Sequence, residues 1–310
     1  MPPPYGIIAN RLRDGQVVPF LGAGASFFGR PADAVWNPAA PAFLPSGLEL
    51  ARLLAGEAGL SEDDTRDLDD LAKVSSYYVD QGGRGELRRQ LRKVFTRAYS
   101  PGPLHTLLAS VTHPQVIVAT NYDTLVEQAF RSAGRPYDLV VYPADRKEVA
   151  NATLWWKHGA GEPIVCEPNK LDIDLSTTTV IYKMHGSVVA DDAAKQWDSF
   201  VITEEDYIEF LSRMTTNTAI PSIFYPHFRE RSFLFLGYSL RDWNLRVVLN
   251  NLSRDLNRRA AADADDVPPS WSVQRQTSTL ERELWKHRGV KIFDVPLDEF
   301  VAQLAAELRS

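Results

Sequence analysis

The clearest pattern along the chain is a set of four short apolar runs, each followed at once by small or polar residues. These runs cover residues 16–21, 115–119, 180–184 and 232–236. Largely apolar runs of this length are typical of strands that are buried on both faces, as in a parallel sheet. Ligands of open parallel sheets bind at the carboxyl ends of the strands. We therefore expect the loops after these four strands to carry the chemistry.

Amphipathic spacing predicts helices that alternate with the strands. Helix-like spacing is found over residues 48–55, 62–70, 87–98, 123–131, 242–252, 279–287 and 297–308, and two more strands are expected over 270–274 and 290–295. The alternation predicts an α/β fold, namely a Rossmann-like parallel sheet with helices on both faces.

The chain is expected to form a single domain over residues 1–310. A helical insert, at about residues 35–112, follows the first strand. Residues of about 137–176 mix short strand-like runs with Gly and Pro, which indicates a cap or a small β-element. A strand–helix segment over 259–310 would complete the fold, and residues 260–269 are predicted to form a surface loop.

Charge and cysteine content narrow the class of protein. The chain has 34 Lys and Arg against 40 Asp and Glu, a net charge of −6, which argues against a surface devoted to neutralising nucleic-acid phosphates. The basic run over 84–93 is accordingly expected to be a solvated helix face. Cys166 is the only cysteine, so no intramolecular disulfide and no Cys-based zinc ribbon can form. The N-terminus lacks the features of a signal peptide and no apolar run reaches membrane-spanning length, so we expect a cytoplasmic protein.

Two of the strand ends carry candidate binding residues. Gly-Ala-Gly-Ala-Ser at residues 22–26 would let the backbone approach a pyrophosphate at a helix N-terminus, although a turn needed only for packing explains the glycines equally well. Thr-Asn-Tyr-Asp follows at residues 120–123. Taken alone, this motif favours helix capping by the Asn or Asp side chain, whereas a functional Asn would hold a ribose hydroxyl or a water.

The other two strand ends add a candidate base and a second turn. His185 follows the third strand and precedes Gly186, a position suited to a general base near neutral pH, although a lone His is more often structural. Gly-Tyr-Ser-Leu-Arg-Asp at residues 237–242 would contact a ribose or phosphate. A plain turn followed by a helix cap is the alternative.

In this order, the four motifs resemble the sirtuin-like (SIR2-like) NAD-hydrolysing effectors of bacterial antiphage defence. The resemblance rests on G-A-G-A-S at 22–26, A-T-N-Y-D at 119–123, K-M-H-G-S at 183–187 and G-Y-S-L-R-D at 237–242, with supporting matches at 45–47 and 103–105. It covers about residues 10–250. Each motif is modestly specific, and the ordered set is much more so.

The resemblance implies that NAD is the substrate and assigns roles by position. Asn121 would hold the nicotinamide ribose and the attacking water, Asp123 would bind the nicotinamide carboxamide, and His185 would contact the ribose hydroxyls and assist proton transfer. The NAD-binding residues, from the pyrophosphate turn to the adenosine ribose, would be Gly22, Ala23, Gly24, Ser26, Thr120, Gly237 and Ser239. Arg30 lies where deacylating sirtuins carry a loop over the nicotinamide pocket, but the local sequence departs from that loop.

One departure from the deacylating sirtuins bears on the reaction. Those enzymes hold a four-cysteine zinc module after the His motif, and with Cys166 alone this chain cannot form one. The loss favours water over an acyl oxygen as the nucleophile. Nicotinamide carries a positive charge while it is bonded to the ribose, and its departure as a neutral base leaves an oxocarbenium-like ribose. The protein therefore needs mainly to orient the ribose, stabilise the developing charge and place a water. No metal is expected.

The leading expectation is an NAD glycohydrolase that releases nicotinamide and ADP-ribose and depletes NAD as an abortive-infection effector. The alternatives are an NAD-dependent protein deacylase, a catalytically silent NAD- or nucleotide-binding subunit and, ranked last, a redox dehydrogenase, which would need a longer Gly fingerprint. Constant NAD cleavage would be toxic, so we expect restraint through homo-oligomerisation or through a separately encoded activator, such as an ATPase or sensor protein. Neither direct nucleic-acid binding nor membrane association is expected.

Overall fold

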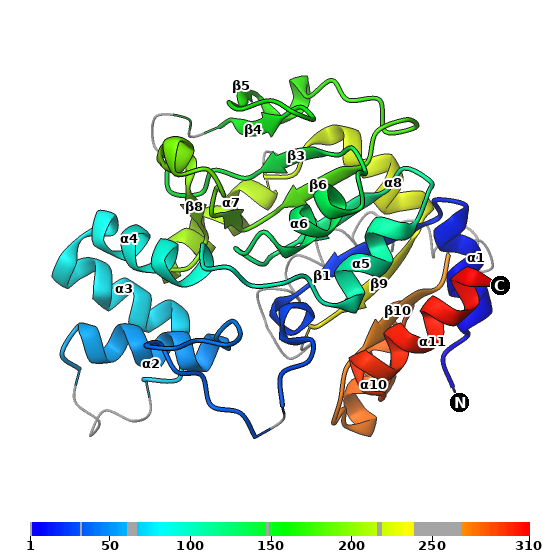
Figure 1. Cartoon of the computed structure of the whole chain (residues 1–310), viewed down its shortest axis with the longest axis horizontal. Coiled ribbons are helices and arrows are strands. Elements are labelled where there is room, and N and C mark those ends of the chain that lie inside the picture. The colour runs from blue at the N-terminus through cyan, green and yellow to red at the C-terminus, as the bar shows by residue number, and fades with distance from the viewer. Residues whose placement is uncertain are drawn as a thin grey trace.

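The computed structural model describes residues 2–31, 33–60, 67–146, 149, 151–215, 219–238 and 268–310. In this part of the chain, a nine-stranded sheet has the order β11-β10-β9-β1-β2-β6-β3-β4-β5. Figure 1 shows it with β4 and β5 at one edge and β10 near the other. The predicted helix over 242–252, residues 62–66 of another and most of the predicted loop over 260–269 lie outside the described residues.

The large sheet is mostly parallel, which confirms the predicted fold class. Its strands are β1 (Val17–Leu21), β2 (Val116–Ala119), β3 (Asp138–Val141), β4 (Thr153–Trp156), β5 (Ile164–Cys166), β6 (Val180–Lys183), β9 (Ser232–Leu236), β10 (Ser270–Val273) and β11 (Val290–Phe293). Each pairing from β11 through to β3 is parallel, whereas β3–β4 and β4–β5 are antiparallel. The four apolar runs predicted first are β1, β2, β6 and β9. A small antiparallel ribbon pairs β7 (Gly186–Ser187) with β8 (Ser199–Phe200).

Helices cover both faces of the sheet. Their bounds are α1 (Tyr5–Arg13), α2 (Gly47–Glu57), α3 (Leu71–Gly82), α4 (Arg84–Phe95), α5 (Pro103–Ser110), α6 (Leu125–Ser132), α7 (Glu204–Thr215), α8 (Tyr225–Glu230), α10 (Thr279–Lys286) and α11 (Leu297–Arg309), and a 3₁₀ turn, η1 (Ala23–Phe27), follows β1. Among the described residues, none of these helices combines the length and apolar character needed to cross a membrane.

Alternate residues of each central strand enter two separate hydrophobic cores. In β1, Val17 and Leu21 pack in the core that α1, α5, α6 and α11 cover, whereas Val18 and Phe20 pack in the core beneath α7 and α8. Helices α1 and α11, near the two ends of the chain, lie side by side (Figure 1). This alternation explains why the strands appear in the sequence as largely apolar runs, since both faces are buried.

Residues 137–176, expected to form a cap or a small β-element, contribute three strands to the main sheet. Strand β3 joins the main sheet parallel to β6, and β4 and β5 extend the same sheet to its edge. A side-chain hydrogen bond also links β3 to β4. The indole Nε1 of Trp155 donates to Oδ2 of Asp138 at 2.8 Å. Backbone pairing to an existing sheet edge satisfies the peptide groups of these short strands, which an isolated element of this size would leave to water.

Helices α2, α3 and α4 stand away from the sheet in Figure 1 and enclose a core of their own. Phe200 of the small ribbon, together with Val188 and Ile202 next to it, completes that core. The helical insert therefore contacts the sheet domain through the segment that follows β6.

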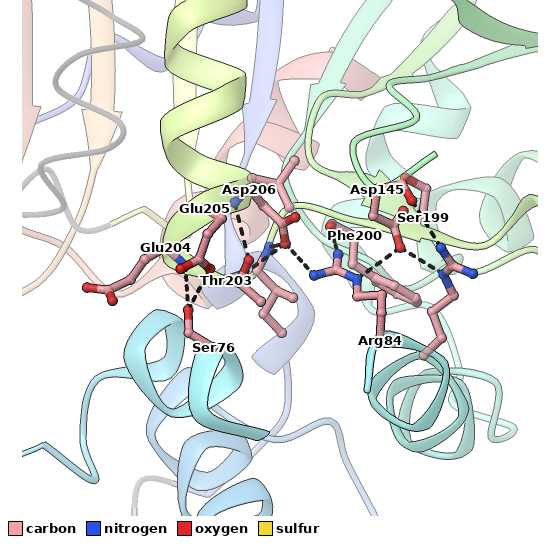
Figure 2. A network of polar contacts seen from close by, with 12 residues as sticks. Ser76, Arg84, Asp145, Ser199, Phe200, Thr203, Glu204, Glu205 and Asp206 are labelled. Atoms are coloured by element: carbon pink, nitrogen blue, oxygen red, sulfur yellow. Dashed lines mark hydrogen bonds and ion pairs between the residues drawn. The ribbon is translucent and has the colours of Figure 1, made fainter. Parts of the chain in front are cut away.

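Charged side chains reinforce this contact, and they correct the expectation for the basic run. Arg84 donates to Oδ2 of Asp206 (2.8 Å), to Oδ2 of Asp145 (3.1 Å) and to the carbonyl of Phe200 (2.6 Å), as Figure 2 shows. Arg88 donates to the same Asp145 oxygen at 2.7 Å. Burial opposes ionisation of Asp145, yet the charges of Arg84 and Arg88 hold the pKa of this carboxyl below its usual value. Arg84 and Arg88 thus bind acidic residues of the sheet domain rather than facing solvent.

A third arginine extends the contact along the same face of α4. Arg92 donates to both carboxylate oxygens of Asp198, at 3.0 and 2.9 Å, and to Asp192. Arg92 lies four residues after Arg88 and eight after Arg84, a spacing that places these three arginines on one helix face. On α3, Ser76 donates to the Glu205 carboxylate of α7 at 2.9 Å. Helix α7 is thus joined to α3 through Ser76 and to α4 through Arg84.

We predict that Arg84→Met destabilises the protein by about 3 kcal/mol, because it leaves the largely buried carboxylate of Asp206 without its cation and Asp145 with Arg88 alone. The matched control is Arg89→Met on the same helix. Arg89 pairs with Glu86 but is 67% exposed, so its loss is expected to change stability by less than about 1 kcal/mol. Urea unfolding of both variants measures the difference, and equal effects would contradict the assigned contact.

Candidate functional site

A cavity of about 650 Å³ opens at the carboxyl ends of the central strands. One wall consists of the loops that follow β1, β2, β6, β9 and β10. The opposite wall comes from the helical insert, through Ser46, Gly47 and Leu50 near the start of α2, Leu71 of α3 and Phe95 of α4. The volume falls in the range of small-molecule sites. The cavity therefore lies between the sheet and the helices that the arginine contacts hold in place.

Most residues predicted from the sequence line this one cavity. They are Ala23, Gly24, Ser26, Thr120, Asn121, Asp123, His185 and Gly237. Gly22 is not in the lining, and its amide donates to the carbonyl of Leu236 at 3.0 Å. Ser239 lies outside the described residues. Motifs distant in sequence are brought together because their strands are neighbours and parallel.

The turn after β1 crosses the turn after β9 at very short distance. The amide of Gly24 donates to the carbonyl of Gly237 at 2.8 Å, and a Cβ on Gly24 would lie 2.9 Å from the Gly237 Cα. Gly237 has φ +72°, and a Cβ there would lie 2.0 Å from the amide nitrogen of Ala25. Both glycines are therefore required by the backbone crossing itself. Contact with a pyrophosphate remains a prediction.

A directed chain of hydrogen bonds fixes the Asn121 side chain. Its Nδ2 donates to Oγ of Ser26 at 2.8 Å, and that hydroxyl donates to Oδ2 of Asp123 at 2.7 Å. The other Asp123 oxygen accepts from the amide of Leu125 at 3.0 Å, as a helix cap does. The Asn121 Oδ1 is buried and has no hydrogen-bond partner among the described residues. Asn121 thus presents an acceptor, while Asp123 caps α6 and orients Ser26.

His185 is enclosed by aromatic rings from α7. Its ring lies edge-on to Tyr207 and Phe210, with centroid distances of 5.6 and 5.2 Å. Burial lowers the pKa of His185 to about 3, so the imidazole is neutral near pH 7. Its Nε2 is a buried atom with no hydrogen-bond partner among the described residues. The following Gly186, with φ +83°, passes so near Ser199 that a Cβ would lie 2.1 Å from its carbonyl oxygen.

Several residues of the cavity were not anticipated. Tyr238 places its hydroxyl 2.6 Å from Oγ1 of Thr120, and Tyr207 comes from a helix that the periodicity had not indicated. A local signal for α7 does exist, because Thr203 and Asp206 form reciprocal side-chain to backbone hydrogen bonds of the capping-box type. Lys183 belonged to a motif but was given no role.

Arg30 is held by the helical insert. Its Nη1 donates to Oε2 of Glu49 at 2.8 Å, and its guanidinium lies 4.4 Å from the ring centroid of Phe43. The hydrogen bond from Arg30 lowers the pKa of Glu49 to about 2, with help from backbone amides of Ser46 and Trp36. Arg30 therefore fixes the loop before α2.

Comparison with known proteins places these features in context. The sequence profile described as SIR2-like domain matches residues 115–293. The NAD(+) hydrolase ThsA of Acinetobacter baumannii (strain 532279) is 29% identical over 247 residues, which cover 79% of this chain and 41% of that protein. ThsA of Enterococcus faecium is 28% identical over 214 residues, covering 66% and 36%. Defense-associated sirtuin 2 of Bacillus subtilis is 20% identical over 231 residues, covering 73% and 19%.

The chain spans about two fifths or less of the length of these relatives. Among solved structures, cytosolic 5′-nucleotidase IIIB bound to cytidine aligns with 98% of this chain and 90% of its own, with a TM-score of 0.35 and 11% identity. A likeness this weak bears on neither fold nor function.

We predict that Gly237→Ala destabilises the protein by about 3 kcal/mol or more, because it adds a steric clash to the cost of a left-handed backbone. Gly134→Ala is the matched control, since Gly134 also has positive φ (+63°) but has nothing within 4 Å of the added Cβ. The control is expected to lose about 1 kcal/mol. Thermal or urea unfolding measures both, and equal losses would show that the crossing is not tight.

His185 also predicts a pH dependence of stability. Because its pKa is about 3 in the folded protein, the unfolded chain alone binds a proton at this site as the pH falls below about 6.5. Stability associated with His185 is thus present above that pH and is lost on acidification. From about pH 7 to pH 5, wild type should lose about 2 kcal/mol more unfolding free energy than His185→Gln. Identical losses in urea unfolding would contradict a neutral, desolvated imidazole.

Proposed function

This chain belongs to the SIR2-like family, and on that premise we propose that it is an NAD hydrolase, which cleaves the bond between nicotinamide and ribose and yields ADP-ribose. The names of two relatives, NAD(+) hydrolase ThsA, support this reaction. NAD is accordingly the substrate, and no metal is assigned a part in the reaction.

The observation that carries the proposal is a pair of polar atoms without hydrogen-bond partners, from two residues that line the same cavity. Asn121 Oδ1 and His185 Nε2 are both buried atoms without hydrogen-bond partners among the described residues, and both residues line the cavity. Leaving such groups unsatisfied costs about 1–3 kcal/mol each, so a ligand that supplies donors gains from them. The hydroxyls of a ribose, or a water held against it, supply such donors.

The sheet also provides the length that a dinucleotide needs. Neighbouring strands lie ~4.8 Å apart, so the three steps from β6 to β9 span ~14 Å. An NAD molecule laid across these strand ends would place its nicotinamide ribose at Asn121 and His185. Its pyrophosphate would lie over the turn of Ala23 and Gly24, and its adenosine ribose beside Gly237. We retain Ser239 and Gly22 in the proposed NAD site, the former at the adenosine ribose.

The proposed chemistry follows from the leaving group. Nicotinamide departs from NAD as a neutral base and leaves positive charge on the ribose, which a protein promotes by orienting the sugar and placing dipoles around it. Asn121 Oδ1 would hold the ribose or the attacking water. Asp123 would bind the nicotinamide carboxamide. A neutral His185 would accept a hydrogen bond from a ribose hydroxyl.

We further propose that the activity serves antiphage defence through NAD depletion in the cytoplasm. The name of the Bacillus subtilis relative, Defense-associated sirtuin 2, supports a defence role. Continuous NAD cleavage would harm the cell that makes the protein. Control by homo-oligomerisation or by a separate activator protein is therefore part of the proposal.

Nicotinamide release from NAD by the purified protein tests the reaction directly. We predict that Asn121→Ala and His185→Ala each lower kcat by about 100-fold or more, since each removes a group that orients the reacting ribose or water. His287→Ala is the control, because His287 is exposed and does not line the cavity. Circular dichroism verifies that each variant keeps its fold.

The outcomes separate the possibilities. Undiminished release by either cavity variant would remove that residue from the mechanism. Failure of every oligomeric form of the wild type to release nicotinamide would contradict the hydrolase proposal. Nicotinamide release that requires an acetylated peptide, with the acetyl group leaving the lysine and ending on ADP-ribose, would instead identify a deacylase.

A further inference from the structure

A buried lysine lies directly beneath the loop that carries Asn121. Lys183 ends strand β6, two residues before His185, and its side chain is 1% exposed. Its ammonium donates to the carbonyl of Asn121 at 3.1 Å and to the carbonyl of Asp123. One cation therefore contacts the backbone on both sides of Tyr122.

This arrangement answers a backbone requirement at the end of β2. The strand pairs with β6 through Ala119, and the chain then leaves the ladder. Carbonyls beyond that point lack strand partners and need another donor when they are buried. The Lys183 ammonium, which carries three donors, supplies two of these carbonyls.

The charge of Lys183 is balanced from α6. Glu127 lies 3.3 Å from the ammonium and is 2% exposed in its side chain. Burial raises the pKa of Glu127 while the nearby Lys183 opposes the rise. Neither Glu127 carboxylate oxygen has a hydrogen-bond partner among the described residues, so this carboxylate interacts with Lys183 through the ion pair. The carboxylate thus offsets the buried charge, whereas the lysine makes the contacts to the loop.

We propose that Lys183 is a positioning residue: its ammonium fixes the backbone of residues 121–123 so that the Asn121 side chain meets both Ser26 and the substrate. The inference rests on the proposed function for its catalytic meaning. It assigns Lys183 no contact with the substrate. Because Lys183 and His185 are on the same strand end, the ammonium also sets the distance between the Asn121 loop and the His185 loop.

If the Lys183–Glu127 ion pair only stabilised the fold, its removal would affect kcat differently than if Lys183 positions the Asn121 loop. Replacing a buried ion pair by apolar residues of similar size is often neutral for stability, whereas removing one partner is strongly destabilising. The double variant K183M/E127L therefore separates the two roles. The double variant removes both charges together with the Lys183 donors that hold the loop. We expect it to be more stable than K183M, because no unpaired charge is left buried.

Nicotinamide release and thermal unfolding are measured for wild type, K183M and K183M/E127L. We expect K183M to lower Tm, and the double variant to regain most of that loss. We expect kcat of the double variant to stay about 100-fold below wild type with KM changed by less than about threefold, since displacement of a reacting group by about 1 Å has effects of this size. The control K286M/E283Q removes an exposed ion pair of α10, whose residues do not line the cavity, and should keep kcat within about threefold of wild type.

A second readout does not depend on turnover. Amide hydrogen exchange over residues 119–125 should be faster in K183M/E127L than in wild type, while exchange in β1 and β9 stays unchanged. Wild-type kcat together with unchanged exchange in the double variant would overturn the proposal. If wild type itself releases no nicotinamide, the proposed function fails, and the exchange measurement still decides whether Lys183 fixes the loop.

Discussion

Parallel pairing of β1 between β2 and β9 is the constraint on which the rest of the structure depends. Parallel strands point their carboxyl ends the same way, so loops that lie far apart in sequence emerge at one edge. The Gly24 to Gly237 crossing is possible only because β1 and β9 are adjacent and in register, with Leu21 opposite Leu236. Without that register, neither the cavity nor its polar lining would form.

The second constraint is the attachment of the helical insert, which supplies the other wall of the cavity. Its own apolar core is completed by residues after β6, and the arginines of α4 add oriented charge contacts to Asp145, Asp206 and Asp198. Apolar burial has little directional preference, whereas a guanidinium bound to a carboxylate and a carbonyl fixes orientation. The wall is therefore positioned by charge as well as by packing.

Within the cavity, the polar groups are arranged before any ligand is bound. Ser26 and Asp123 set the rotation of the Asn121 amide, Lys183 fixes its backbone, and the rings of α7 keep His185 neutral. Such arrangement in advance reduces the reorganisation that a reaction requires. It also explains why acidic and basic side chains that never reach the ligand matter for the site.

The apolar strand runs, the mostly parallel α/β class and the motifs at the strand ends can all be predicted from the sequence alone. These features are local, because a strand buried on both faces is largely apolar and the loop after it begins with small or polar residues. Thus β1, β2, β6 and β9 and the residues after them were predictable, as was the similarity that the four motifs share with a family.

The tertiary structure decided what depends on distant partners. The basic run looked like a solvated helix face because its acidic partners, such as Asp145 and Asp206, lie far along the chain. Strands β3, β4 and β5 looked like a separate element because pairing to a sheet edge leaves no local mark. The pKa of His185 is low because the side chain is buried, in part by rings of α7. Lys183 acts through hydrogen bonds to two carbonyls in the loop that follows β2. Charge pairing, desolvation and backbone crossings are properties of neighbours in space, and only the folded chain specifies those neighbours.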